Sequence, residues 1–122
     1  METDEFLKAI EELKEKSREG WVIVVEGIKD EIALREIGIE GEIITFSGFL
    51  STAEKVKDKN VIILTDYDSK GFEIEKGLLK ILLSYGNVAN VELKRRIFSQ
   101  VKKEITKVEE IHRYLVRNCY EV

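Results

Sequence analysis

Two short, continuous apolar runs constrain the fold more than any other feature of the sequence: WVIVV at residues 21–25 and VIILT at residues 61–65. Both are rich in β-branched residues, and an apolar run without polar alternation is typical of a strand buried on both faces of a parallel sheet. Shorter apolar runs at residues 43–46 and 88–93 predict two more strands. The sequence therefore predicts a four-stranded sheet.

Helical patterns separate the predicted strands. Three segments have apolar residues at helical spacing and a glycine after them as a stop signal, and they are residues 4–18, 30–37 and 71–85. Further helices are expected from the capping boxes Ser51/Glu54 and Thr106/Glu109 and over residues 94–101. Strands that alternate with helices imply parallel pairing. We therefore predict an α/β fold: a three-layer, Rossmann-like sandwich over residues 1–122, with a mainly parallel four-stranded sheet and helices on both faces.

Composition and charge limit the classes of function. No apolar run approaches the ~20 residues needed to span a bilayer, and the acidic N-terminal segment is unlike a signal peptide, so we expect a cytoplasmic protein without a membrane partner. The lone cysteine, Cys119, cannot form an internal disulfide. Residues 1–92 carry 12 Lys and Arg against 20 Asp and Glu, whereas residues 93–122 carry 8 against 4. Such a basic segment can mark a phosphate-facing surface, although a solvated face is the more common explanation.

Acidic residues follow the first and third predicted strands directly. Glu26 comes after residues 21–25, and Asp66 and Asp68 come after residues 61–65. Ligands of parallel α/β sheets bind beyond the carboxyl ends of the strands. If the first and third strands are neighbours, as in the common order 2-1-3-4, their backbones lie ~4.8 Å apart, and the three carboxylates are expected in one crevice. Converging carboxylates repel one another, and a hard divalent cation with oxygen ligands relieves that repulsion. The pattern therefore predicts a Mg²⁺ site with Glu26, Asp66 and Asp68 as ligands.

Each acidic motif is weak evidence by itself. Acidic residues after strands commonly begin loops or cap helices, and a DxD triplet arises by chance in many proteins. The combination is stronger, because both motifs occupy equivalent strand ends and have a glycine close by, Gly27 or Gly71, where backbone or phosphate can approach closely. Gly71 also lies at the start of a predicted helix whose N-terminal amides favour an anion. Tyr67 is expected to point away from its acidic neighbours and to pack.

The two motifs resemble the signatures of the topoisomerase–primase (Toprim) domain family, which has a glutamate after the first strand and a DxD after the third. The first motif reads VVEGIKDEIALREIG at residues 24–38, and the second reads ILTDYDSKG at residues 63–71. The resemblance spans about residues 21–92. Among members of the family, the chain is nearest in length to small stand-alone Toprim proteins similar to the bacterial nuclease that matures 5S ribosomal RNA.

This resemblance implies catalytic roles for the three acids and a supporting role for a fourth. Glu26 would act as the general acid or base in strand cleavage or nucleotidyl transfer, and Asp66 and Asp68 would hold Mg²⁺, or Mn²⁺ in its place. Asp30 matches an acidic position in the following helix that supports the loop. The first cation after the glutamate–glycine pair is Lys29, one position later than in that nuclease type, which leaves its contact with phosphate an open question.

Basic residues and glycines complete the predicted set of phosphate or nucleic-acid contacts. The set comprises Gly27, Lys29, Lys70, Gly71, Arg95 and Arg96. Lys94, Lys102, Lys103 and Lys107 lie in the same basic C-terminal segment as the two arginines and could also track a phosphate backbone.

Three functions remain open on the sequence alone. The first is a metal-dependent enzyme that cleaves or processes nucleic acid at its phosphodiesters, with RNA expected before DNA. The second is a non-catalytic metal-binding module that recognises nucleic acid or a protein. The third, a receiver-like phosphoacceptor, fits less well, because receivers place the acidic pair after the first strand and a single aspartate after the third. The state of assembly, monomer or homodimer, also stays open.

Overall fold

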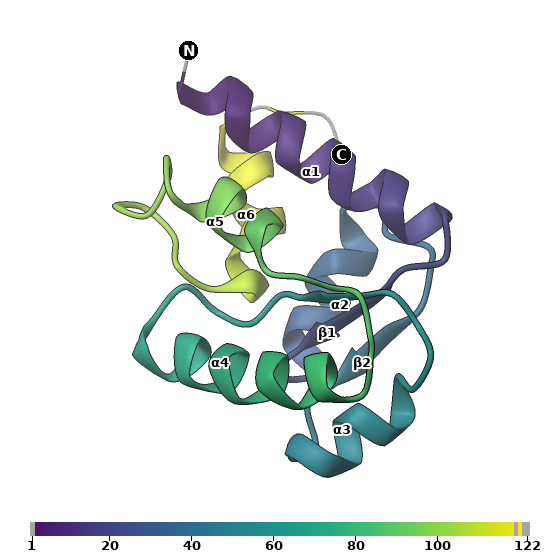
Figure 1. Ribbon diagram of the computed structural model, residues 1–122. Helices are drawn as coiled ribbons and strands as arrows, with labels where there is room; N and C mark the ends of the chain where they lie inside the picture. The colour runs from purple at the N-terminus through teal and green to yellow at the C-terminus, as the bar shows by residue number, and fades with distance from the viewer. Residues whose placement is uncertain (1, 119, 121–122) are drawn as a thin grey trace.

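A four-stranded parallel sheet forms the centre of the molecule, in the order β2-β1-β3-β4 (Figure 1). The computed structural model describes residues 2–118 and 120, and Cys119 lies outside these residues. The strands are β1 (Val22–Val25), β2 (Ile43–Thr45), β3 (Val61–Ile63) and β4 (Ala89–Asn90). Every neighbouring pair is parallel, which confirms the predicted α/β fold. Strand β1 lies next to β3, which is the condition for a shared crevice at the two acidic motifs.

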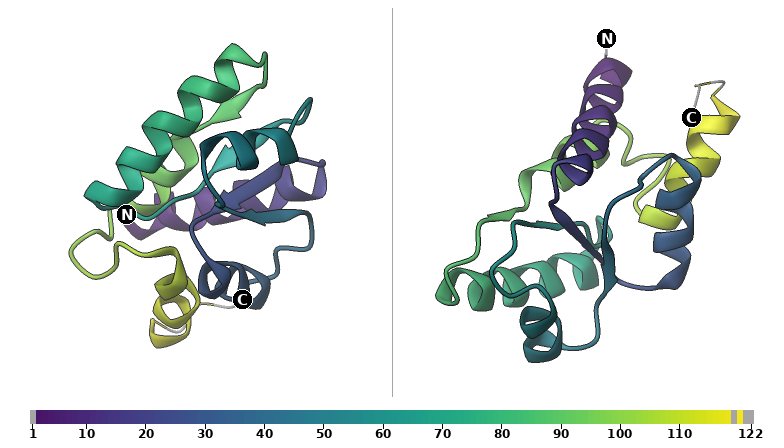
Figure 2. Two further views of the ribbon diagram at one scale, coloured as in Figure 1. Left: turned by 90° about the horizontal axis from the view of Figure 1, so that it is seen from below. Right: turned by 90° about the vertical axis from the view of Figure 1, so that its right-hand side faces the viewer.

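Helices cover both faces of the sheet, so the fold has the three predicted layers (Figure 2). The helices are α1 (Glu2–Arg18), α2 (Ile28–Glu36), α3 (Phe49–Lys55), α4 (Ser69–Ser84), α5 (Glu92–Phe98) and α6 (Ile111–Arg117), and a single 3₁₀ turn, η1 (Val108–Glu110), precedes α6. Helices α3 and α4 pack on one face, and α1, α2, α5 and α6 pack on the other. Within the described residues, none of these helices is both long enough and apolar enough to cross a membrane.

The alternation of side chains along β1 divides the core into two clusters. Val22 and Val24 face α3 and α4, whereas Ile23 and Val25 face α1, α2 and the C-terminal helices. All four side chains are almost completely buried, which is the physical reason for the unbroken apolar run. The same alternation holds in β3, so both strands that carry the acidic motifs are fixed by packing on two sides.

Both predicted capping boxes are wrong in detail. Helix α3 begins at Phe49, after Gly48 with a φ of 106°, so Ser51 lies inside the helix instead of capping it. At the C-terminal turn the capping carboxylate belongs to Glu110, not to Glu109: its Oε1 accepts hydrogen bonds from the backbone N–H groups of Thr106 and Lys107, each at 3.2 Å. Local spacing favoured the wrong residue in both cases, because loop geometry decides which side chain reaches the free amides.

The division of α4 into a buried face and an exposed face gives a matched test of the fold. Leu78 is fully buried against the sheet, whereas Leu83 in the same helix is 59% exposed. We expect Leu78→Ala to lower the free energy of unfolding by roughly 2–5 kcal/mol and Leu83→Ala to change it by less than about 0.5 kcal/mol. Urea denaturation of the two variants measures both values. Similar losses in the two variants would contradict the described packing of α4.

Candidate metal and phosphate site

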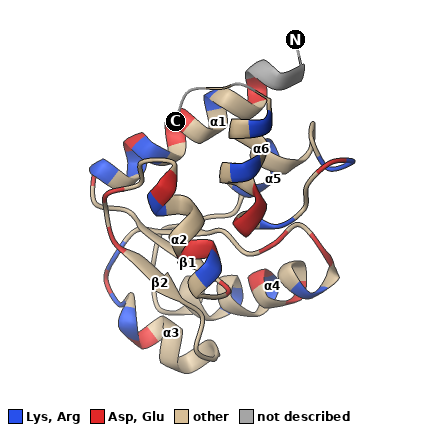
Figure 3. Ribbon diagram, turned by 180° about the vertical axis from the view of Figure 1, so that it is seen from behind, with Lys and Arg blue, Asp and Glu red and all other residues tan. Residues whose placement is uncertain are grey.

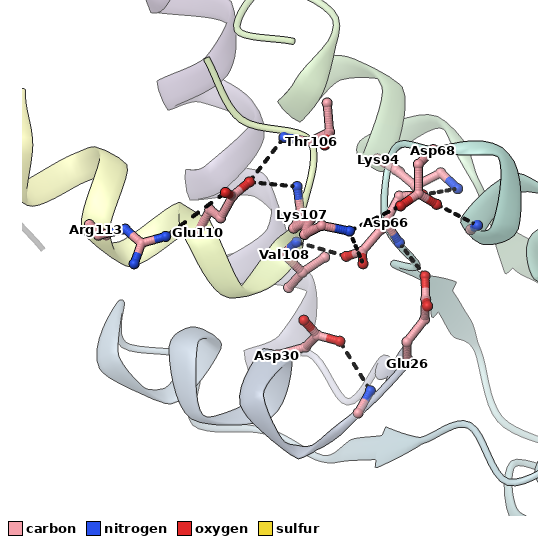
Figure 4. Close-up of polar contacts among 12 residues, drawn as sticks. Glu26, Asp30, Asp66, Asp68, Lys94, Thr106, Lys107, Val108, Glu110 and Arg113 are labelled. Atoms are coloured by element: carbon pink, nitrogen blue, oxygen red, sulfur yellow. Dashed lines mark hydrogen bonds and ion pairs between the residues drawn. The ribbon is translucent and has the colours of Figure 1, made fainter. Parts of the chain in front are cut away.

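Glu26 and Asp66 lie side by side where β1 and β3 end (Figure 4). The ladder between the two strands continues beyond them, because the Leu64 N–H donates to the carbonyl of Val24 at 2.8 Å. Two residues later the Asp66 N–H donates to Glu26 Oε2 at 2.9 Å. The predicted neighbourhood of the two motifs is therefore present, and the Glu26 carboxylate has a fixed orientation.

Asp66 and Asp68 each divide their two carboxylate oxygens between a backbone amide and the same cation. Asp66 Oδ1 accepts from the Val108 N–H at 2.9 Å, and Asp68 Oδ1 accepts from the Gly71 N–H at 2.7 Å. The Oδ2 atoms of both residues face the ammonium of Lys107, at 3.9 Å for Asp66 and 3.3 Å for Asp68. Two carboxylate oxygens from one loop thus converge on a single positive charge.

The predicted cluster of three metal-ligating carboxylates is not assembled in this arrangement. Among residues 2–118 and 120, no three His, Cys, Asp or Glu side chains are grouped as they would be around a metal ion. Glu26 contacts the backbone of Asp66 instead of sharing a cation with it. The donor set still fits a hard divalent ion, because two carboxylate oxygens already converge on one cation and backbone N–H groups orient their partner oxygens. The assignment of Glu26, Asp66 and Asp68 as ligands stays a prediction.

The two aspartates differ in their electrostatics. The pKa of Asp66 is raised to about 6, chiefly by burial and also by the nearby Asp30 and Glu26 carboxylates, against the lowering effect of the Val108 N–H. The pKa of Asp68 is lowered, chiefly by the hydrogen bond from Gly71 and then by Lys107. Asp68 also caps α4, which is the common structural role of an acidic residue that follows a strand. A buried, poorly compensated Asp66 is the group that gains most from a cation.

A pocket of about 380 Å³ opens beside these acids, between the start of α2 and η1. Its lining consists of Glu26, Gly27, Ile28, Lys29, Asp30, Asp66, Lys107 and Glu109. Asp30 Oδ2 accepts the Gly27 N–H at 3.0 Å and so braces the turn after β1, which is the position expected for a supporting residue. Burial raises the pKa of Asp30, as for Asp66. The pocket places cationic and anionic groups within reach of one ligand.

Gly71 has a structural reason for its place in the second motif. A Cβ atom at this position would collide with the backbone carbonyl of Asp66, so the close approach that the sequence indicated is made by the protein backbone. Its own carbonyl accepts a hydrogen bond from the Thr65 hydroxyl at 2.6 Å. Lys70 is exposed in the first turn of α4, and Tyr67 packs against Phe72 and Phe98, as expected.

Lys94 does not line a phosphate-binding surface, because its side chain is completely buried. Its ammonium lies 2.8 Å from Glu75 Oε1 and 3.9 Å from the centre of the Phe72 ring, and donates to the Thr65 hydroxyl at 3.1 Å. The sequence offered one overlooked signal: Glu75 falls on the apolar face of α4, in helical register with the buried Leu78, and a charge there requires a buried partner.

Arg95 and Arg96 are engaged with acidic side chains of the same molecule. Arg96 pairs with Glu5 and Glu12 of α1, both at 2.7 Å, and therefore fixes α1 to α5. Arg95 pairs with Glu75 at 3.0 Å and keeps a 47% exposed side chain. Acidic and basic residues are interleaved along the helices (Figure 3). Arg96 thus forms ion pairs within the molecule, and we leave it out of the proposed phosphate contacts.

The contact between Gly71 and Asp66 predicts that an added methyl group disturbs the second motif. We expect Gly71→Ala to cost roughly 1–3 kcal/mol of unfolding free energy, because backbone atoms must move. Gly27→Ala is the matched control, since a Cβ there meets nothing within 4 Å; it should cost about 1 kcal/mol or less, the difference between glycine and alanine at a helix N-cap. Equal losses in urea denaturation would count against the close approach.

The raised pKa of Asp66 predicts a pH dependence of stability in metal-free protein. With a pKa of about 6 in the folded state and an ordinary value of 3.8 otherwise, the folded protein holds the proton more tightly. The contribution of Asp66 is therefore complete below about pH 4 and lost as the pH rises through about 6. Relative to Asp66→Asn, the wild type should lose roughly 1–3 kcal/mol of unfolding free energy between pH 4 and 7.

Urea denaturation in the presence of EDTA measures this difference. Asp58→Asn, a substitution at an exposed aspartate, serves as the control for the chemical change alone. Parallel pH profiles for the wild type and Asp66→Asn would show that Asp66 has an ordinary pKa in the folded protein.

The chain is similar to known proteins in both sequence and structure. A Toprim domain family model matches residues 20–92. The UPF0292 protein of Archaeoglobus fulgidus is 62% identical over 87% of this chain and 86% of its own length, and that of Thermococcus gammatolerans is 41% identical over 88% and 80%. A solved structure, a putative protein from Aquifex aeolicus, is 33% identical, covers 84% of this chain and 94% of its own, and superimposes with a TM-score of 0.71.

The match covers both acidic motifs and the sheet that carries them. Toprim domains generally bind Mg²⁺, and the domain indicates a metal-dependent function related to nucleic acids. The receiver-like alternative is therefore set aside. More than half of the chain matches the domain, and relatives at 62% and 41% identity align over most of both chains, so this protein belongs to the Toprim domain family, alongside the UPF0292 proteins.

Proposed function

We propose that this protein is a Mg²⁺-dependent enzyme that cleaves phosphodiester bonds in nucleic acid, with RNA as its substrate. The observation that carries the proposal is the pair of Oδ2 atoms of Asp66 and Asp68, which face one cationic position beside the oriented carboxylate of Glu26. The choice of RNA over DNA follows only the general similarity to small stand-alone Toprim proteins of the type that includes the nuclease that matures 5S ribosomal RNA, and not a match of substrate-binding residues.

The proposed role of each side chain follows from its surroundings. Asp66 and Asp68 would hold the metal, which supplies positive charge to the scissile phosphate when bound. Glu26 is anchored by the amide of Asp66 and moves the proton of the attacking or leaving oxygen. Lys29 and Lys70 are exposed in the first turns of α2 and α4, where helix N-termini and cations both favour flanking phosphates.

A second candidate is a non-catalytic module that binds nucleic acid or a protein through its metal. One observation favours it: Glu26 is occupied by a backbone amide, and no three-carboxylate group is assembled within the described residues. In this alternative Glu26 has only a structural task, which is to connect the ends of β1 and β3.

Glu26→Gln separates the two candidates. Glutamine keeps an oxygen that can accept the Asp66 N–H, so the fold is retained, but it cannot move a proton. We expect Mg²⁺-dependent cleavage of labelled RNA to fall by about 10²- to 10⁴-fold, the range typical of a lost general acid or base. The measurement is single-turnover cleavage resolved by gel electrophoresis, with Glu73→Gln, an exposed position on α4, as the control.

The outcomes are distinct for each candidate. Cleavage by the wild type and by Glu73→Gln, but not by Glu26→Gln, supports the enzyme. Metal-dependent retention of intact RNA, equal in wild type and Glu26→Gln, supports the binding module. Cleavage of matched DNA in preference to RNA would leave the chemistry in place and overturn the assigned polymer.

A further inference from the structure

We propose that Lys107 is the resident counter-cation of the acidic site, and that a divalent metal displaces it so that its ammonium transfers to a phosphate of the substrate. The inference rests on the metal-binding part of the proposed function and not on cleavage. It assigns to one side chain two successive partners, first the carboxylates and then the nucleic acid.

The first step of the argument is the position of the ammonium. Lys107 Nζ lies between the two oxygens, Oδ2 of Asp66 and Oδ2 of Asp68, that backbone amides leave available (Figure 4). A metal bound to those two oxygens and the ammonium cannot occupy the same position. The positive charges of the metal and the ammonium would also repel each other at close range. Binding of the metal therefore requires the ammonium to leave.

The second step is that only the Lys107 side chain has to move. The backbone on both sides of it is fixed: the Thr106 carbonyl accepts the Tyr67 N–H at 2.7 Å, and the Val108 N–H is bonded to Asp66. Glu110 in turn holds the amides of Thr106 and Lys107. The side chain itself is 47% exposed, and a lysine ammonium on a flexible four-carbon stem can change its direction without any change of fold.

The third step is where the displaced ammonium goes. Lys107 lines the same pocket as Glu26, Lys29 and Asp66, and its fixed backbone keeps it beside the pocket. A phosphate that approaches a metal held by Asp66 and Asp68 therefore arrives next to Lys107. The ammonium then exchanges two carboxylate contacts for one phosphate contact. The two aspartates and the phosphate carry three negative charges, which the divalent ion and the ammonium together balance.

This exchange gives Lys107→Gln two effects of opposite sign. We expect Mn²⁺ to bind about 3- to 10-fold more tightly, because no ammonium competes, which corresponds to a free-energy gain of roughly 0.7–1.4 kcal/mol. We also expect metal-dependent binding of single-stranded RNA to weaken, with the slope of log affinity against log salt reduced by about 0.7, the value for one phosphate contact.

The measurements use the full chain and do not depend on turnover. Free Mn²⁺ is counted by electron paramagnetic resonance in titrations of wild type, Lys107→Gln, Lys107→Arg and Lys103→Gln, and RNA binding is measured by fluorescence anisotropy in a Glu26→Gln background. Lys107→Arg keeps the charge and should bind Mn²⁺ like the wild type. Lys103→Gln removes an exposed lysine from the preceding turn and controls for net charge.

The results separate this inference from the proposed function. Tighter Mn²⁺ binding together with the reduced salt slope in Lys107→Gln supports the exchange, even if no variant cleaves RNA. Unchanged or weaker Mn²⁺ binding in Lys107→Gln overturns it, even if the wild type cleaves RNA. Equal gains in Lys107→Gln and Lys103→Gln also overturn it, because they would reflect net charge and not displacement from the two aspartates.

Discussion

Parallel pairing of β1 with β3 is the constraint on which the candidate site depends. The register places Val24 beside Ile63, and the hydrogen bond from Asp66 to the Glu26 carboxylate extends that pairing beyond the last strand residues. Because side chains alternate along a strand, a slip of one residue would turn the acids of one strand to the opposite face. The register is held by apolar side chains packed on both faces, so hydrophobic burial supplies the free energy that brings two anions together.

A buried ion pair fixes the loop that carries the two aspartates. Lys94 and Glu75 are both almost completely buried, and such a pair commonly stabilises a fold less than apolar residues of the same volume would. The pair contributes here by orienting polar groups of the loop. The Lys94 ammonium reaches the Thr65 hydroxyl and, at 3.4 Å, the carbonyl of Asp66, and Thr65 continues the network to Gly71. Apolar replacements could fill the space but could not hold these backbone groups, and the carboxylates follow the backbone.

Sequence patterns predicted the strands and the helices on both faces of the sheet, because these depend on local periodicity. The meeting of Glu26 with Asp66 followed from the general geometry of parallel sheets once the common strand order was assumed. The sequence patterns did not predict which cations would be internal. Lys94, Arg96 and Lys107 belong to one basic segment, yet one is buried, one connects two helices and one faces the aspartates. Their different environments come from packing between elements distant in the chain, about which the charge count of a segment contains no information.

The opposite pKa shifts of Asp66 and Asp68 explain why the loop needs a cation at all. Asp68 has an amide of α4 and an ammonium to stabilise its charge. Asp66 is buried beside Glu26 and Asp30, and the amide of Val108 does not offset that environment. A positive charge near both Oδ2 atoms therefore lowers the free energy of the loop, whichever ion carries it. Lys107 meets this requirement, and the same electrostatic requirement would drive the proposed replacement of its ammonium by a divalent ion.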